Sequence, residues 1–506
     1  MSRPTRVALF LVLLHFLTAM LDPFGSDSFG DQQVSDFFDR VSSPLYGGAE
    51  RIAQSEILVV RITPEDLENR LGGGAWPPSY ESQLAILEGL TRHGPTAIFM
   101  DFYYRTAQAP EGRPRVMDLQ GERNLQDVFE ALSQEARGGR AEDIRGTEEV
   151  AVFAEGLRRL RYGEGGEIPI LIGPIGQNAS TADRVSLADP FEPLRAYAAE
   201  TTRTPDLSVG ISVSVNGAIV YPSHSVYTSA FETSRSSPQA AHVLFKLFCD
   251  SRRAQWDRFD ACRKPGVLEN EGNDIALRWG FGSPADASAN RPDWRRILPG
   301  CEAGTWGQRV RKALAFASEK AVSGLNDGMN GRDCAYHMSI EVGDLFGGLP
   351  DDQLASMIED KIVLIGADVP YLADNFDTPV YGSLPGVFIH AMALDNLIEL
   401  GPRADRAPRD ILFAMDETDL IIGGIMTLAI GVLLYQRRRE IVIEGTQTRP
   451  ETVRWARYAL TIAAVTAISV VVIGGIGNWP IGNVFELVLS ISGMAVVLEA
   501  FAREEA

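Results

Sequence analysis

The sequence lacks the motifs and the charge that would assign it to most enzyme classes or to nucleic-acid binding. No Walker loop, HExxH, GxSxG elbow or kinase loop occurs in its 506 residues. Positive charge is scarce, since 47 basic residues stand against 67 acidic ones and the net charge is -20. A general nucleic-acid binder would carry a basic surface, so we expect no nucleic-acid partner. With 45% hydrophobic and 23% charged residues, the chain is also not a disordered one.

Long apolar stretches are few and lie near the two ends of the chain. The mean hydropathy of -0.03 therefore indicates a polar body with a few apolar spans. The first stretch lies in residues 1–22, where the run Val7–Leu21 follows a basic start. Its length, about 22 Å as a helix, also suits a signal peptide, but no clean Ala-x-Ala cleavage site follows. We expect an uncleaved anchor, with a cleaved signal as the alternative. Three further stretches span residues 419–436, 458–477 and 481–501.

Arginine is distributed unequally between the loops that join these stretches. Residues 437–457 contain six arginines, whereas the short linker 478–480 contains no basic residue. The positive-inside rule places the arginine-rich loop in the cytoplasm, so both termini lie inside and four spans are required. We therefore expect a multi-pass protein of a bacterial plasma membrane, with residues 45–410 forming one large extracytoplasmic, periplasmic domain.

All four cysteines fall in the predicted extracytoplasmic part. An even number of cysteines in an oxidising compartment indicates disulfides, and four cysteines allow three pairings. The shortest loops favour Cys249 with Cys262 and Cys301 with Cys334. A tetrahedral metal site is the alternative, but no Cys-x-x-Cys spacing supports it.

Alternating strand and helix patterns predict an α/β fold with a mixed sheet for this domain. The apolar run 57–62 predicts a buried strand, and Thr63 with the acids that follow it predicts a helix start. A helix after Trp76 and a strand over 97–102 then complete a right-handed parallel crossover. Further strands are predicted at 168–172, 209–215, 218–221, 275–279 and 362–365, and a further helix at 385–400.

Six motifs follow one another along the predicted domain: Ile57–Ile62, Trp76–Pro77, Ala97–Asp101, Asp360–Gly366, Asp374–Pro379 and Pro385–Ala391. In these motifs and in their order, the chain resembles the CHASE domain of type 2, a cyclase- and histidine-kinase-associated sensory extracellular domain of bacteria, over about residues 45–400. The layout of one span before the domain and three after it is also similar. The resemblance implies an extracytoplasmic sensor that signals through its spans.

The chain departs from the family pattern at two points. Thr63 stands where the family often has an aspartate, which weakens any carboxylate role there. After Phe501 only five residues follow, so the usual cytoplasmic output domain is absent from this sequence. We therefore expect no cytoplasmic catalytic core, no enzymatic activity and no cofactor.

Four residues form the predicted ligand site. Asp374, Asp377 and His390 lie in the most specific motifs, and Asp101 lies at the carboxyl end of a predicted strand. Ligands of open α/β sheets gather at such ends, and two carboxylates with an imidazole suit a cation or a basic or hydroxylated ligand. The structural alternative is that the aspartates cap a turn and the histidine packs in the core. An exported hydrolase that uses these residues is a further hypothesis.

Within the last apolar stretch, Glu486 needs a polar partner or water. Small residues spaced four apart on two of the spans permit close helix contact.

We expect a receptor subunit that relays an unknown ligand or envelope signal to a separate membrane or cytoplasmic protein. The alternative is a structural or assembly subunit of a larger envelope complex. A homodimer is an expectation by analogy with the family.

Overall fold

The computed structural model describes most of the chain between residues 36 and 401. The fold below refers to residues 36–47, 52–71, 76–102, 145–162, 167–173, 192–199, 207–228, 234–263, 274–282, 304–316, 336–372 and 374–401, with short gaps within some ranges, and to scattered positions from 404 to 465.

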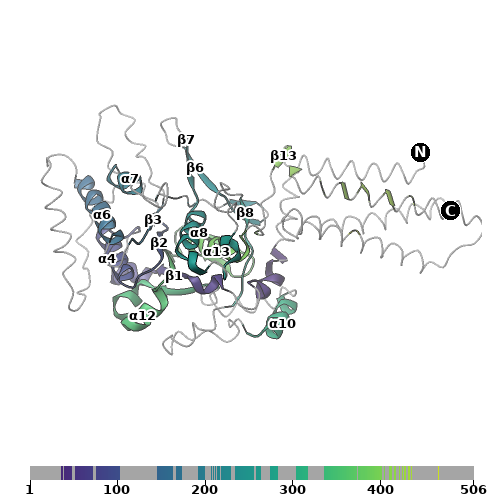
Figure 1. The fold of residues 1–506 in the computed structure, drawn as a ribbon, viewed down its shortest axis with the longest axis horizontal. Helices are drawn as coiled ribbons and strands as arrows, with labels where there is room; N and C mark the ends of the chain where they lie inside the picture. Colours follow the sequence, from purple (N-terminus) through teal and green to yellow (C-terminus); the bar gives the residue numbers. More distant parts are fainter. Residues whose placement is uncertain are drawn as a thin grey trace, which may run out of the picture.

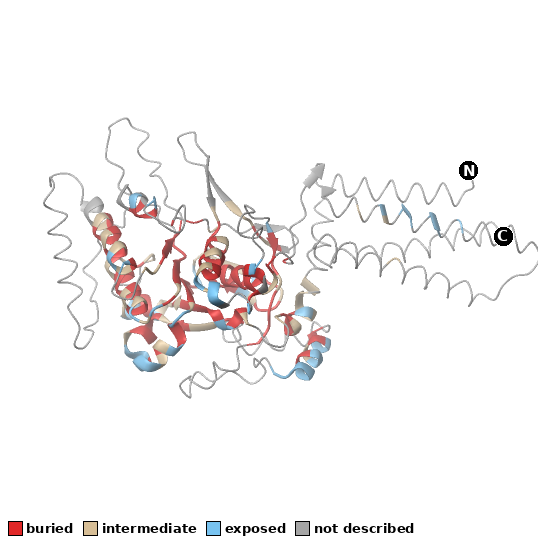
Figure 2. Ribbon diagram, in the orientation of Figure 1, coloured by how far each residue is buried: buried red, intermediate tan, exposed pale blue. Residues whose placement is uncertain are grey.

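A five-stranded parallel sheet forms the centre of the fold, in the order β3-β2-β10-β1-β9 (Figure 1). Four of the strands are buried along almost their whole length, as Figure 2 shows in red, which explains why they read as continuous apolar runs. The central pairing joins β1 to β10 from Ile57 opposite Ile362 to Ile62 opposite Ala367. The strands are β1 (Ile57–Ile62), β2 (Ala97–Met100), β3 (Ile170–Ile172), β9 (Met338–Glu341) and β10 (Ile362–Ala367).

Two helices from distant parts of the chain pack together over the sheet. Helix α13 (Gly386–Leu400) contacts β1 and β10, while α8 (Ala240–Ser251) contacts β2 and packs along α13. Thirteen of the residues of α13 are buried, so it is a core helix with no solvent face of any width. The remaining helices are α3 (Pro64–Asn69), α4 (Tyr80–Thr91), α6 (Arg145–Arg161), α7 (Glu192–Ala199), α10 (Trp306–Phe316) and α12 (Asp351–Ile358).

The antiparallel strands that we expected within a single mixed sheet form separate small sheets instead. Residues 209–215 were predicted as one strand; among its described positions, Ser214–Asn216 forms a strand, and Val209 bonds to Ile172 at the end of β3. One small sheet has three strands in the order β4 (Ser214–Asn216), β5 (Ala218–Tyr221) and β8 (Ile275–Ala276). The two-stranded sheets are β6 (His224–Thr228) with β7 (Ser234–Pro238), β11 (Asn375–Thr378) with β12 (Gly382–Pro385), and β13 (Asp410–Leu412) with β14 (Met415–Asp416).

Short helical turns complete the described part. Two of them, η2 and η3, precede β1, and the disulfide-linked η6 follows α8. The turns are η2 (Ser43–Leu45), η3 (Ala53–Glu56), η5 (Arg253–Gln255), η6 (Asp260–Arg263) and the π-helical η10 (Asp344–Gly348).

The predicted helix start after β1 is confirmed. Thr63 accepts a hydrogen bond from the Asp66 amide, and the Asp66 carboxylate accepts one from the Thr63 amide at 3.1 Å, which makes a capping box. The Asp66 carboxylate also bonds to Arg70 and to the Gly343 amide at 3.0 Å. This buried aspartate is therefore part of the framework that ties α3 to the loop after β9.

The predicted spans fall largely outside the described residues. Segments 1–22, 458–477 and 481–501, and with them Glu486, contain almost no described position. Across the described part of the chain, no helix combines the length and the hydropathy of a membrane span. The four spans and the domain boundaries drawn from them therefore stay predictions.

Candidate functional site

The site is built where β2 ends against the first turn of α13. The Asp101 amide donates to the Ile365 carbonyl at 2.8 Å, so the residue is still held to β10 at the carboxyl edge of the sheet. Its side chain is buried, and Oδ1 lies 3.6 Å from Nε2 of His390. His390 lies one turn into α13 and is buried as well. The structure therefore brings together two residues that the sequence places 289 positions apart.

Tyr221, at the end of β5, contacts the opposite side of the His390 ring. Its hydroxyl lies 2.7 Å from Nδ1 of His390 and accepts a hydrogen bond from the Ala241 amide at 3.0 Å. Because the amide can only donate, the tyrosine keeps its own hydrogen for Nδ1. In that arrangement the proton of the neutral imidazole sits on Nε2 and faces Asp101. Sequence analysis missed Tyr221, because a tyrosine in a strand carries no signal that it will meet a histidine.

Asp374 supplies the second carboxyl group. It precedes β11, and its carbonyl accepts a hydrogen bond from the Gly386 amide at 2.9 Å. A Cβ atom on Gly386 would lie 2.4 Å from Oδ1 of Asp374, so only glycine lets this carboxyl group approach the start of α13. Burial raises the pKa of Asp374 to about 6.

Burial shifts the pKa of all three side chains away from their ordinary values. Burial, and then the negative charge of Asp374, raises the pKa of Asp101 well above its usual range. Burial also lowers the pKa of His390 to about 3, so the imidazole is neutral at pH 7. Among the described residues, Oδ2 of Asp101 is buried without a hydrogen-bond partner. The cluster therefore favours a bound proton, a cation or a hydrogen-bond donor.

The structure separates Asp377 from this cluster. Asp377 is exposed on β11, opposite Ser383 of β12, and no contact with Asp101 or His390 is seen among the described residues. Of the four residues predicted for the site, Asp101, Asp374 and His390 lie together and Asp377 does not. The described residues also contain no group of three or more histidine, cysteine or acidic side chains arranged to hold a metal ion.

The neighbouring acids at this edge of the sheet already have a counter-ion. Arg61, near the end of β1, lies 2.9 Å from Asp368 and 3.2 Å from Glu341. An ion pair of this kind offsets the cost of burying the carboxylate. Oδ1 of Asp368 is also buried without a hydrogen-bond partner among the described residues, but Asp101 differs from Asp368 in having no arginine or lysine partner in the described part of the chain.

A second histidine–aspartate pair lies at the opposite edge of the sheet. Asp395 of α13 accepts from the Tyr46 hydroxyl at 2.8 Å on Oδ1 and lies 3.1 Å from Nε2 of His337 on Oδ2. All three side chains are buried. Burial and then the charge of Asp395 raise the pKa of Tyr46 well above its usual range, which keeps its hydroxyl protonated as a donor. We interpret this network as structural.

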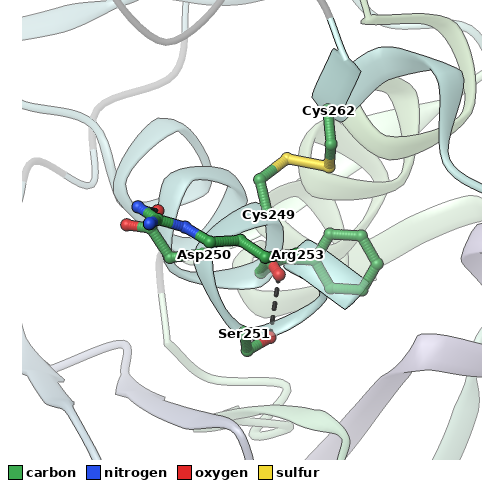
Figure 3. The surroundings of a disulfide bond; sticks show 6 residues. Cys249, Asp250, Ser251, Arg253 and Cys262 are labelled. Carbon is green, nitrogen blue, oxygen red and sulfur yellow. Dashed lines mark hydrogen bonds and ion pairs between the residues drawn. A yellow bond between two sulfur atoms is a disulfide. The ribbon is translucent and has the colours of Figure 1, made fainter. Parts of the chain in front are cut away.

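One disulfide lies in the described part of the chain (Figure 3). It joins Cys249 of α8 to Cys262 of η6, with the two Cα atoms 5.3 Å apart. Both cysteines are buried, and Ala261 beside Cys262 lies against Gly401 at the end of α13. This bond belongs to the pairing that the short loops favour. Cys301 and Cys334 lie outside the described residues, so their pairing stays a prediction.

Comparison with known families identifies the class of the domain. The sequence matches the CHASE2 domain over residues 7–242 and 305–433, which is more than half of the chain. The chain therefore belongs to the CHASE2 family, whose domain is an extracellular sensory domain and not a catalytic one. No output-domain family was found. No curated protein and no solved structure matches the chain.

Proposed function

We propose that the chain is the receptor subunit of a bacterial signalling system, held in the plasma membrane by four helices with its sensory domain in the periplasm. Membership of the CHASE2 family supports the sensory role. The described positions of segment 419–436 support the anchoring, because they are helical and expose Leu428, Val432 and Tyr435. Large apolar side chains exposed along one helix are typical of a segment that contacts lipid.

The signal is received at the cluster of Asp101, Asp374 and His390. The observation that carries this proposal is the unpaired, buried Oδ2 of Asp101 beside a second carboxyl group. A ligand that presents a positive charge or a hydrogen-bond donor provides that oxygen with a partner. A positively charged ligand also weakens the repulsion between the carboxyl groups of Asp101 and Asp374. A ligand without either group gains nothing from these contacts.

Helix α13 transmits the signal. His390 lies in its first turns, at the ligand, and its last residue, Leu400, is followed by the chain that leads to segment 419–436. A ligand that binds two arrangements of α13 with different affinity shifts the balance between them by that difference. A separate membrane or cytoplasmic protein then reads the position of the spans.

The test compares two ligands of the same length and different charge. Purified full-length protein in detergent is heated with putrescine or with 1,4-butanediol, and the melting temperature is recorded. We expect putrescine to raise it and Asp101→Asn to abolish the rise, since a ligand at about 100 times its dissociation constant stabilises by about 2.7 kcal/mol.

Asp377→Asn is the matched control, because it removes an exposed carboxyl group of the same motif and should leave the response unchanged. An equal rise with the diol would show that the site requires a hydrogen-bond donor and not a positive charge. If no cationic or hydroxylated compound shifts the melting temperature, the sensory fold is better explained as a docking body in an envelope complex.

A further inference from the structure

Helix α10 exposes an apolar stripe to solvent. Trp306, Val310 and Leu314 are 55%, 37% and 72% exposed and follow one another at intervals of four residues. Residues spaced in this way lie above one another on one side of a helix. The adjoining side is buried through Ala313 and Phe316, and the Phe316 ring packs edge-on against Phe281 with 4.9 Å between the ring centres. The stripe is therefore held firmly in place and is not a frayed end.

The exposed hydrophobic side chains of the domain are concentrated on this helix. Outside segment 419–436, the described residues expose five large hydrophobic side chains, of which three belong to α10. The other two, Tyr162 and Tyr371, lie singly on different elements. Single exposed hydrophobic residues are ordinary on a protein surface, whereas a contiguous group marks a contact surface.

The charge of α10 is opposite to that of the chain. The helix carries Arg309, Arg311 and Lys312 and no acidic residue, although the net charge of the whole chain is -20. Of these three, Arg311 is exposed, whereas Arg309 is buried and Lys312 lies over the Phe281 ring on the core side. An exposed apolar stripe that contains tryptophan, with an exposed cation beside it and no acidic residue on the helix, suits a helix that lies in a membrane interface.

The position of α10 fits this chemistry. It packs against η2, where the Phe281 amide donates to the Ser43 carbonyl at 3.0 Å. Tyr46, directly after η2, bonds to Asp395 in the second half of α13. The helix thus lies at the edge of the sheet where the chain arrives from predicted span 1–22 and departs towards segment 419–436. Figure 1 shows α10 and β13 at the same end of the described body, away from α4 and α6.

We propose that α10 lies on the outer surface of the plasma membrane, with its apolar stripe among the lipid chains and the exposed Arg311 near anionic headgroups. This inference rests on the membrane anchoring in the proposed function. Such helices enter the headgroup and acyl boundary by about 5–10 Å. A basic residue near an anionic surface adds electrostatic attraction. The contact fixes the orientation of the domain relative to its spans.

The experiment measures whether lipid touches Trp306. The full chain and its W306F variant are reconstituted into nanodiscs of phosphatidylcholine and phosphatidylglycerol, with and without bromine on the upper acyl carbons. The difference between the two proteins isolates the fluorescence of Trp306. We expect brominated lipid to lower that component about twofold, and to lower it less when phosphatidylglycerol is left out.

The outcomes distinguish this inference from the proposed function. A chain that does not enter the discs contradicts the anchoring and this inference together. A chain that enters them with Trp306 unquenched contradicts this inference alone, and a lower number of copies per disc in V310S/L314S would then assign the stripe to a second copy. Equal quenching without phosphatidylglycerol would contradict the attraction of Arg311 to anionic headgroups. Tyr371→Ser, on another element, is the matched control for exposed apolar surface.

Discussion

Helix α13 carries one histidine–aspartate contact towards each edge of the sheet, and the two contacts differ in how fully the aspartate is bonded. At the amino edge, Asp395 has a donor on each oxygen, from Tyr46 and His337. At the carboxyl edge, Asp101 has only His390 at 3.6 Å, and its second oxygen has no hydrogen-bond partner among the described residues.

This difference separates a fully bonded pair from the pair that we propose to receive the signal. A fully bonded buried network rigidifies the fold, whereas an unbonded buried oxygen costs stability. Natural proteins keep such costs mainly where function needs them. The same residue pair is therefore fully bonded at one edge, whereas at the other it leaves the oxygen to which the proposed ligand would bind.

The largest expected effect distinguishes the two aspartates directly. Asp395→Ala leaves the Tyr46 hydroxyl and the His337 imidazole in the core without their hydrogen-bond partner, so we expect it to lower the free energy of unfolding by about 3–5 kcal/mol. Asp101→Ala removes one long contact and one carboxylate repulsion, so we expect a change within about 1 kcal/mol. Thermal unfolding of the full-length variants in detergent measures both. Equal losses would contradict the distinction between the pairs.

The two tyrosines sharpen the comparison with a smaller effect. Tyr46→Phe leaves a charged carboxylate oxygen without its donor and should cost about 2 kcal/mol. Tyr221→Phe leaves the Ala241 amide and the neutral His390 ring without a partner and should cost about 1 kcal/mol. Denaturant midpoints measured side by side give the order. The reverse order would place the stronger network at the carboxyl edge.

The pH dependence of stability tests the cluster at the carboxyl edge, where two groups act in opposite directions. The folded state raises the pKa of Asp374 to about 6, so its contribution is fully present below about pH 3.8 and is lost as the pH rises through about 6. His390 acts in the opposite direction: its pKa of about 3 gives a contribution present above about pH 6.5 and lost as the pH falls through about 3. Asp374→Asn removes only the first contribution.

We therefore expect the Asp374→Asn variant to melt at a higher temperature than the wild type at pH 8 and at about the same temperature at pH 4. Because Asp374 is partly exposed, the difference should be only about 1 kcal/mol. Melting curves across this pH range decide the matter. A difference in melting temperature that does not vary with pH would show that the folded state does not raise the pKa of Asp374.

The smallest expected effect belongs to Asp377. Because the side chain is exposed on β11, Asp377→Asn should change stability by less than about 0.5 kcal/mol. It should also leave the pH dependence of melting unchanged. A clear effect in either measurement would return Asp377 to the cluster.

The sequence predicted the elements of the site better than their arrangement. Strand β1 and its capped helix follow from an apolar run and from Thr63, which are local signals. Asp101 was placed at a strand's carboxyl end by the same logic, and Asp374 and His390 by the family motifs. Asp377 was predicted with them, but it lies exposed on β11 away from the other three, because two-residue alternation does not tell which face of a hairpin is covered.

Long-range contacts were outside the reach of this reasoning. Tyr221 meets His390 across 169 residues, and no property of either residue indicates the other. The separate antiparallel sheets were merged into one for the same reason, because strand patterns do not name their partners. The family match also omits residues 243–304, which contain most of α8 and the disulfide.

The strand order has a consequence for biosynthesis. Both neighbours of β1 come from the far end of the domain, since β9 begins at Met338 and β10 at Ile362. Until the ribosome has made those residues, β1 has neither of its neighbours and apolar strand edges stay unpaired. We therefore expect truncation before β10 to yield aggregates and no smaller folded domain.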